Sequence, residues 1–395
     1  MKLFYNPFPI FWLFGLINNV LYVVILSAAV DLVNLTTPKS LILLVDILPS
    51  LLVKLVCPFY IHKIQYGVRI IILILLSVIG MMMVSVHYTL TWTLLGIILA
   101  SMSSGFGEVT FLQLTHYQTE TYTLLSDENE DNNSKKALNG WSSGTGGAGL
   151  VGSFCYLFLT SICNISIPAS LLCFAVLPIG FLLYFQLNLE PQSSVNLSNM
   201  STNQWIVNNF SVWSRLKMLI IPYMLPLTSV YFFEYLINQS ISPTLLFPVE
   251  VIPFFHRYRD LYVLYSTLYQ VGVFIARSSG RWIRLKKLYT LTYLQSLNFI
   301  ITLLQSWYFI NSRWPYLNML VIFWEGLLGG SSYVNTFLNV QDDLPHEQIE
   351  FSMGSVSIAD SLGIFLASLV GLLLEPTLCD HQVQDGRPWC RMVEK

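Results

Sequence analysis

The chain has 395 residues, of which 54% are hydrophobic and only 11% are charged. Soluble globular proteins have a charged share of about a quarter, so the composition excludes that class and predicts a polytopic membrane protein. The formal net charge is −2, and no basic run with interleaved aromatic residues indicates a nucleic-acid partner.

Apolar stretches of the length of a spanning helix, about 20 residues, recur along the whole chain. Eleven such stretches are predicted: 9–33, 40–60, 68–87, 89–113, 139–161, 167–188, 217–238, 259–279, 288–310, 315–340 and 351–375. The first is too long for the apolar region of a signal peptide and is interpreted as a retained span.

Two long polar connections, 114–138 and 190–214, have the composition of flexible cytosolic loops. The second connection divides the spans into six and five. We therefore expect an all-α, two-bundle architecture of about 11 transmembrane helices. The expected parts are a six-helix bundle (1–189), a cytosolic linker loop (190–214), a C-terminal helix bundle (215–376) and a tail (377–395).

Lys and Arg fall mostly on the side of the N-terminus, with a dense run at 277–287, so that side is predicted to be cytosolic. The two halves also resemble each other. A shift of about 216 residues places Asn18 on Glu234, and Glu108 within one residue of Glu325.

The glycine-rich stretch 139–152 permits three interpretations. It fits the nucleophile elbow G-x-S-x-G around Ser142 and, from Gly144 to Gly149, the dinucleotide fingerprint. Both motifs require a strand, a turn and a helix in a soluble unit, whereas this stretch continues into apolar sequence. Close helix packing is therefore favoured, with small residues including Gly144, Gly146, Gly147 and Gly149 at the interface.

No C-x-x-C pair or H-E-x-x-H pattern occurs, so neither a metal nor another cofactor is expected. An enzyme that uses Ser142 ranks last, because no acid and histidine partner is placed near it. Cys379 and Cys390 lie in the polar tail, where they could pair if the tail faces an oxidising lumen.

Ionisable residues inside spans are costly and usually serve a function. This chain has Asp46, Lys54, Glu108, Glu234, Glu325 and Asp360, together with Asn18 and Asn19 in the first span. Asp46 and Lys54 are two helical turns apart on one face, so a structural charge pair competes with substrate contact there. Three of these acids, Glu108, Glu234 and Glu325, are expected near one cavity, where they would repel one another, so at least one must hold a proton or a cation must compensate.

Sequons and a sorting pattern complete the candidate sites. Asn34 and Asn238 are the best placed glycosylation acceptors. The string from Glu120 to Leu124 and Leu125 fits an acidic dileucine signal, which would bind sorting adaptors and direct the chain to endosomes or lysosomes.

Several blocks of sequence closely resemble the battenin family. They include Phe11-Trp-Leu-Phe-Gly-Leu-Ile-Asn-Asn19, Ser103-Ser-Gly-Phe-Gly-Glu108, Trp141-Ser-Ser-Gly-Thr-Gly-Gly-Ala-Gly149, Glu234-Tyr-Leu-Ile-Asn-Gln239, Tyr269-Gln-Val-Gly-Val-Phe-Ile-Ala-Arg277 and Glu325-Gly-Leu-Leu-Gly-Gly330. The resemblance implies a late endosomal and lysosomal protein, distantly related to the major facilitator superfamily, whose loss causes neuronal ceroid lipofuscinosis. It also implies a role in clearing glycerophosphodiesters, the deacylated products of phospholipid breakdown. The tail has no C-a-a-X box, so prenyl anchoring is not expected.

Three functional hypotheses remain open. The first is export of glycerophosphodiesters by alternating access, with Lys54 and Arg277 as partners of the anion and protons held by Glu234 or Glu325. The second is transport of a basic amino acid such as arginine, linked to lysosomal pH, because the acids suit a cation. The third is a membrane-trafficking scaffold that acts through 114–138 and 190–214.

Overall fold

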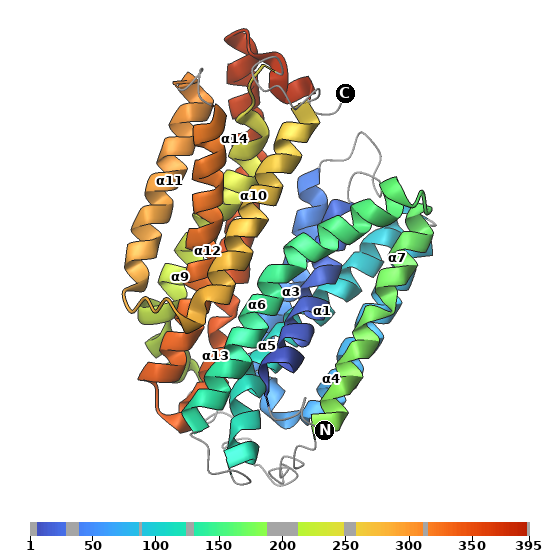
Figure 1. Ribbon diagram of the computed structural model, residues 1–395, viewed down its shortest axis with the longest axis vertical. Coiled ribbons are helices and arrows are strands. Elements are labelled where there is room, and N and C mark those ends of the chain that lie inside the picture. Colours follow the sequence, from blue (N-terminus) through green and yellow to red (C-terminus); the bar gives the residue numbers. More distant parts are fainter. Residues whose placement is uncertain are drawn as a thin grey trace. The chain divides into compact units, whose positions relative to one another are not determined.

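The computed structural model describes residues 6–28, 39–86, 89–123, 130–187, 212–248, 258–310 and 315–392. Within these ranges the regular elements are helical and none is a strand (Figure 1). The all-α prediction is therefore confirmed. A helix satisfies its own backbone hydrogen bonds, which is what an apolar segment needs in lipid.

The main helices follow the predicted spans closely. They are α1 (Phe8–Ser27), α3 (Lys39–Tyr60), α4 (Tyr66–Val86), α5 (Leu90–Thr123), α6 (Glu130–Leu157), α7 (Ile167–Ala175), α9 (Leu225–Leu236), α10 (Tyr258–Ser278), α11 (Leu288–Tyr308), α12 (Pro315–Asp343), α13 (His346–Val356) and α14 (Ile358–Gln384). A tighter helix, Leu177–Leu187, follows α7, and a π-helical turn, Ile237–Ile241, continues α9.

Seven segments of the described chain are long and apolar enough to cross a membrane. The count of eleven spans stays a prediction. One connection differs from expectation, because α5 continues to Thr123 and α6 already begins at Glu130, so much of the predicted loop 114–138 is helical. Acidic residues at a helix start interact favourably with the helix dipole, which suits the sequence from Glu130 onward.

The chain forms two compact units. The first comprises Met1–Leu225 and Thr336–Ala359, and the second comprises Pro226–Asn335 and Asp360–Lys395. The first unit thus includes the end of α12 and all of α13, in addition to the helices of the predicted N-terminal bundle. Of the predicted linker 190–214, residues 190–211 lie outside the described ranges.

Glycines allow α1 and α6 to pack closely in the first unit. A Cβ atom at Gly144 would overlap the backbone of Trp12 and Leu16, and one at Gly140 would overlap that of Phe8. Gly146, Gly147 and Gly149 are buried in the same helix. Because α6 is one uninterrupted helix here, the structure contradicts the nucleophile elbow and the dinucleotide fingerprint and supports helix packing.

The second unit contains an equivalent contact. A Cβ atom at Gly363 of α14 would meet the carbonyl oxygen of Thr228 and the amide of Phe232 on α9. Thr228 and Phe232 follow Trp12 and Leu16 by 216 residues, the offset that relates the two halves of the sequence. A glycine of a later helix therefore approaches α1 and α9 at corresponding positions, although the two glycines, Gly144 and Gly363, are 219 residues apart.

Polar contacts hold α13 in the first unit, where it packs against α5 and α3. The Tyr66 hydroxyl donates to the Glu350 carboxylate at 2.6 Å, and Lys135 pairs with Asp342 at 2.9 Å. These contacts come from both sides of the link between α12 and α13, which explains why this segment groups with the first unit.

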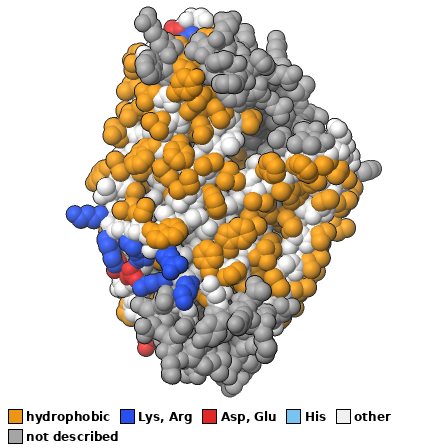
Figure 2. Space-filling view, in the orientation of Figure 1, with side chains coloured by type: hydrophobic (Ala, Val, Ile, Leu, Met, Phe, Trp, Pro, Cys, Tyr) orange, Lys and Arg blue, Asp and Glu red, His pale blue; other side chains and the backbone are white. Residues whose placement is uncertain are grey.

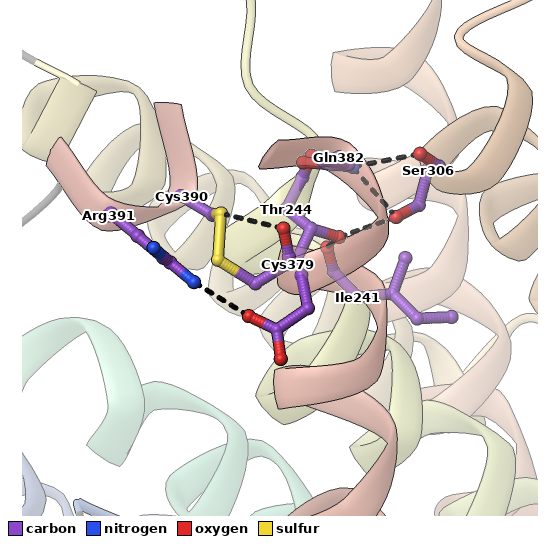
Figure 3. The surroundings of a disulfide bond; sticks show 8 residues. Ile241, Thr244, Ser306, Cys379, Gln382, Cys390 and Arg391 are labelled. Atoms are coloured by element: carbon purple, nitrogen blue, oxygen red, sulfur yellow. Dashed lines mark hydrogen bonds and ion pairs between the residues drawn. A yellow bond between two sulfur atoms is a disulfide. The ribbon is translucent and has the colours of Figure 1, made fainter. Parts of the chain in front are cut away.

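Figure 3 shows the surroundings of Cys379 and Cys390 in the C-terminal segment, with Gln382 directed towards Ser306. Cys379 and Cys390 form a disulfide, so the predicted pairing is confirmed. Gln382 donates to the Ser306 carbonyl at 2.8 Å, and Arg387 donates to the Trp307 carbonyl at 2.8 Å. These carbonyls belong to the last turn of α11, where no intrahelical donor is available, so the segment supplies a C-terminal cap.

The described part of the face in Figure 2 is covered mostly by hydrophobic side chains, and Lys and Arg gather towards one end of it. Along α4, for example, Ile71, Leu75 and Ile79 are about half exposed. Apolar side chains that face outward along whole helices are expected of a protein whose solvent is lipid.

Candidate functional site

The second unit contains a buried polar stripe that begins on α9. Tyr231, Glu234 and Asn238 follow one another at spacings of three and four residues, so they lie on one face of the helix. Tyr231 and Glu234 are buried, with the Glu234 side chain among the least exposed carboxylates of the described chain. A buried carboxylate requires donors, and the neighbouring helices supply them.

Helix α10 presents Tyr269 and Arg277 to this stripe, eight residues apart and therefore on one face. The Tyr269 hydroxyl donates a short hydrogen bond to Oε1 of Glu234. Arg277 donates through Nη2 to the Tyr231 hydroxyl at 2.7 Å, and its guanidinium lies 4.1 Å from the centre of the Tyr333 ring. The aromatic rings thus hold the guanidinium in a fixed position.

Helix α12 completes the stripe with Glu325, Gly329 and Tyr333 at every fourth position. The amide of Asn238 donates to Oε1 of Glu325 at 2.9 Å. A Cβ atom at Gly329 would overlap the Glu234 carboxylate, so the glycine is what lets this side chain lie against α12. The three helices together form a ladder about two turns long, with acids at one end and Arg277 at the other.

The balance of charge in the stripe is incomplete. Within the described residues, Oε2 of Glu234 and Oε2 of Glu325 accept no hydrogen bond. Asp360 of α14 is also buried and interacts electrostatically with Tyr231. Among the described residues the stripe thus contains three acids and one guanidinium, and ionised buried carboxylates with few donors are costly. The arrangement can therefore hold a proton on a carboxyl group or take up a charged ligand.

The first unit has a different polar core. Lys54 of α3 pairs with Glu108 of α5 at 2.6 Å, and both side chains are buried. Asn18 of α1 donates to the Ser104 carbonyl at 3.2 Å. The ion pair seen for Lys54 is thus with Glu108 of α5, and a role for Lys54 in contact with an anion stays a prediction. Asn19 is only half-buried on the same helix.

The structure therefore brings together Glu234, Arg277 and Glu325 in one unit, and Lys54 and Glu108 in the other. The sequence analysis missed Tyr231, Tyr269, Tyr333 and Gly329. The spacing of eight residues places Tyr269 on the face of Arg277 and Tyr333 on the face of Glu325, but this spacing alone does not distinguish them from the other tyrosines of the chain.

The geometry argues against glycosylation at Asn238. Its side-chain nitrogen, which would carry the glycan, donates to Glu325 inside the apolar segment Val212–Thr244. Asn34, Leu124 and Leu125 lie outside the described residues, and the Glu120 side chain is not among those described. Glycosylation of Asn34 and sorting through the dileucine pattern stay predictions.

Comparison with known proteins extends these observations. A sequence profile of the CLN3 protein family matches residues 9–212 and 188–381. The chain is 52% identical to Protein BTN1 of Eremothecium gossypii and 52% identical to Protein BTN1 of Saccharomyces cerevisiae, with 97% of both chains covered in each case. It is 42% identical to Protein btn-1 of Neurospora crassa, over 98% of this chain and 91% of the relative. The chain belongs to the CLN3, or battenin, family.

Solved structures show that this CLN3 family chain has the fold of major facilitator superfamily transporters. It superposes on the proton:xylose symporter XylE with a TM-score of 0.61 at 10% identity, covering 99% of this chain and 94% of that one. The superposition on the human organic anion transporter MFSD10 has a TM-score of 0.60 at 12% identity and covers 98% of this chain and 96% of that one. The superposition on the FucP transporter in an outward conformation has a TM-score of 0.56 at 14% identity and covers 99% of this chain and 94% of that one. At these identities the likeness concerns the fold alone.

Proposed function

We propose that this CLN3 family protein is a transporter that exports glycerophosphodiesters from the lysosomal and late endosomal lumen by alternating access, coupled to protons. The family resemblance supports the substrate class and the compartment, and the fold supports the mode of action. In this account the protein serves lysosomal homeostasis by removing the products of phospholipid breakdown.

The observation that carries the proposal is the position of Arg277. A phosphodiester is a single anion, and a planar guanidinium matches its oxygens with two parallel donors. Arg277 is held by Tyr231 and Tyr333 within a buried polar stripe. Lys54, the other basic residue considered, is neutralised by Glu108 at 2.6 Å and is therefore a weaker anion partner.

The carboxyl groups suit proton coupling. An anion that enters the stripe is repelled by ionised Glu234 and Glu325, and protonation in an acidic lumen removes that repulsion. The Oε2 atoms of these residues, which accept no hydrogen bond from the described part of the chain, can carry the proton. Among the structural neighbours, XylE and FucP are proton symporters and MFSD10 transports organic anions, which makes the combination chemically consistent with the fold.

Substitution of Arg277 tests this assignment. We expect Arg277→Gln to raise the half-saturating concentration of labelled glycerophosphoglycerol by roughly tenfold or more, since a charge-assisted hydrogen bond is lost. Arg277→Lys should recover only part of the affinity, because an ammonium lacks the planar fork. Uptake by isolated vesicles measures both. Arg281→Gln, an exposed arginine just beyond α10, is the matched control. Unchanged uptake in Arg277→Gln would refute the role of this residue.

A specific observation favours a second candidate, transport of arginine with an effect on lysosomal pH. Glu234, Glu325 and Asp360 outnumber Arg277 in the stripe, and a cationic substrate would supply the donors that two carboxylate oxygens lack. Competition between arginine and the diester for uptake distinguishes the two, because only the favoured class should inhibit transport at low concentration.

A further inference from the structure

Asn238 occupies an unusual position in α9. It lies in the π-helical turn Ile237–Ile241, directly after the regular part of the helix ends at Leu236. A wide turn of this kind inserted in an α-helix frequently accompanies a functional site. The Asn238 side chain is directed towards α12, as its hydrogen bond to Glu325 shows.

One nitrogen atom of Asn238 makes two contacts. Nδ2 donates to Oε1 of Glu325 at 2.9 Å and to the backbone carbonyl of Glu234 at 3.2 Å. An amide nitrogen carries two N–H groups, so both bonds can form together. The side chain therefore ties the Glu325 carboxyl group to the turn of α9 that bears Glu234.

Glu325 depends on this contact. Its side chain is fully buried, and within the described residues its other oxygen, Oε2, accepts no hydrogen bond. Glu325 interacts electrostatically with Glu234. The titratable and charged groups around Glu234 are Tyr231 on α9 and Tyr269 and Arg277 on α10. Next to these lie Tyr235 on α9, Tyr333 on α12 beside Arg277 and Asp360 on α14 beside Tyr231. Among the described residues, Asn238 is the one that donates a hydrogen bond to the Glu325 carboxyl group.

We propose that Asn238 is a positioning residue that orients the Glu325 carboxyl group and sets the pH at which it exchanges its proton. An amide donor stabilises a carboxylate more than a carboxylic acid, because the bond to the charged form is stronger. The significance of this residue for transport rests on the proposed proton coupling, whereas its effect on Glu325 does not.

The same geometry changes the meaning of a sequence motif. Asn238-Gln-Ser240 has the form of a glycosylation sequon. A nitrogen that donates to a buried carboxylate inside an apolar helical segment is not accessible for glycan transfer. Asn238 is thus expected to remain unmodified, and Ser240→Ala, which destroys the sequon but keeps the amide, should leave the protein unchanged in electrophoretic mobility.

Labelling with dicyclohexylcarbodiimide tests the proposal, since this reagent reacts with protonated carboxyl groups in apolar surroundings. The full chain is purified without substrate, and modification of Glu325 is quantified by mass spectrometry as a function of pH. We expect Asn238→Leu, which has a similar shape and no donor, to move the labelling midpoint upward by about one pH unit. If Asn238→Leu does not fold, Asn238→Asp replaces it, because this change keeps the shape and the polarity of the side chain. We expect Asn238→Asp to move the labelling midpoint of Glu325 upward as well.

The matched control is Gln239→Leu, a change in the same turn. Neither Gln239→Leu nor Ser240→Ala should move the labelling midpoint of Glu325. An unchanged midpoint in both Asn238 variants would overturn the proposal. So would a glycan on the wild-type chain that is lost in Asn238→Leu and in Ser240→Ala. A shifted midpoint in a protein that shows no diester flux would refute the proposed function and leave this inference standing. Diester flux together with an unshifted midpoint would refute this inference and leave the proposed function standing.

Discussion

At the scale of single residues, Glu234 links the helices of the stripe. It accepts from Tyr269 of α10 and fills the space left by Gly329 of α12. Glu234→Gln keeps the shape and an acceptor for Tyr269 but cannot ionise. We therefore expect uptake by isolated vesicles to lose its dependence on lumenal pH and to fall roughly tenfold or more, equivalent to about 1.4 kcal/mol of lost stabilisation.

The matched control for that change is Glu375→Gln, which alters a carboxylate near the end of α14 and away from the stripe contacts described above. Uptake and pH dependence that both remain at wild-type level in Glu234→Gln would remove this residue from the proton pathway.

The ion pair of Lys54 and Glu108 is expected to be structural. Removing one partner of a buried pair leaves an uncompensated charge, which costs about 3–5 kcal/mol, whereas replacing both with apolar residues is often nearly neutral. Lys54→Met and Glu108→Leu should each destabilise the protein strongly, and the double variant should recover most of the loss. Thermal unfolding of the purified variants measures this. Additive losses in the double variant would show that the two residues act independently.

At the scale of helices and caps, the C-terminal disulfide closes the segment that caps α11. A disulfide typically contributes about 2–4 kcal/mol by restricting the unfolded chain. Cys390→Ser should lower the free energy of unfolding by that amount and also release the donors that Gln382 and Arg387 supply to α11. Denaturation of the purified protein tests this, with Cys163→Ser, an exposed free cysteine, as control. Equal stability of the two variants would contradict the proposed cap.

The helices themselves were predictable because a lipid-spanning segment must be apolar for about 20 residues. The residues at which these helices begin and end were less predictable. Polar turns continue α5 to Thr123 and start α6 at Glu130, and neither extension carries an apolar signal. The break at Ser357, between α13 and α14, lies inside a stretch that reads as one apolar run.

Within the site, the charged residues were predictable and their partners were not. A carboxylate in an apolar span is conspicuous, so Glu234 and Glu325 were found from the sequence alone. The chain has 21 tyrosines, so the sequence alone does not indicate that Tyr231 and Tyr269 contact the charged residues of the stripe. The hydrogen bond from Asn238 to Glu325 was not predictable from the sequon, because a sequon depends on three neighbouring residues and contains no information about contacts with other helices.

At the scale of the whole molecule, the described residues form a buried polar cluster around Lys54 in the first unit and another around Glu234 in the second, and the two clusters differ in charge balance. The core of the first unit pairs its lysine with a carboxylate, and the core of the second sets Arg277 among three acids. The 216-residue offset relates Asn18 to Glu234, and it also relates the residues of α1 and α9 that the glycines of later helices approach, as expected of related halves. Because the acids of the second unit outnumber its guanidinium, we propose that substrate and protons bind in this unit.

The most direct test of the central claim is flux across proteoliposomes that contain the purified protein under a lysosome-like pH gradient. Labelled glycerophosphoglycerol is the substrate, and unlabelled arginine is the competitor. The account predicts saturable, pH-dependent flux of the diester that arginine does not inhibit. Inhibition by arginine would transfer the site to basic amino acids, and absence of flux for both ligands, from protein shown to be folded, would contradict transport and favour a scaffold.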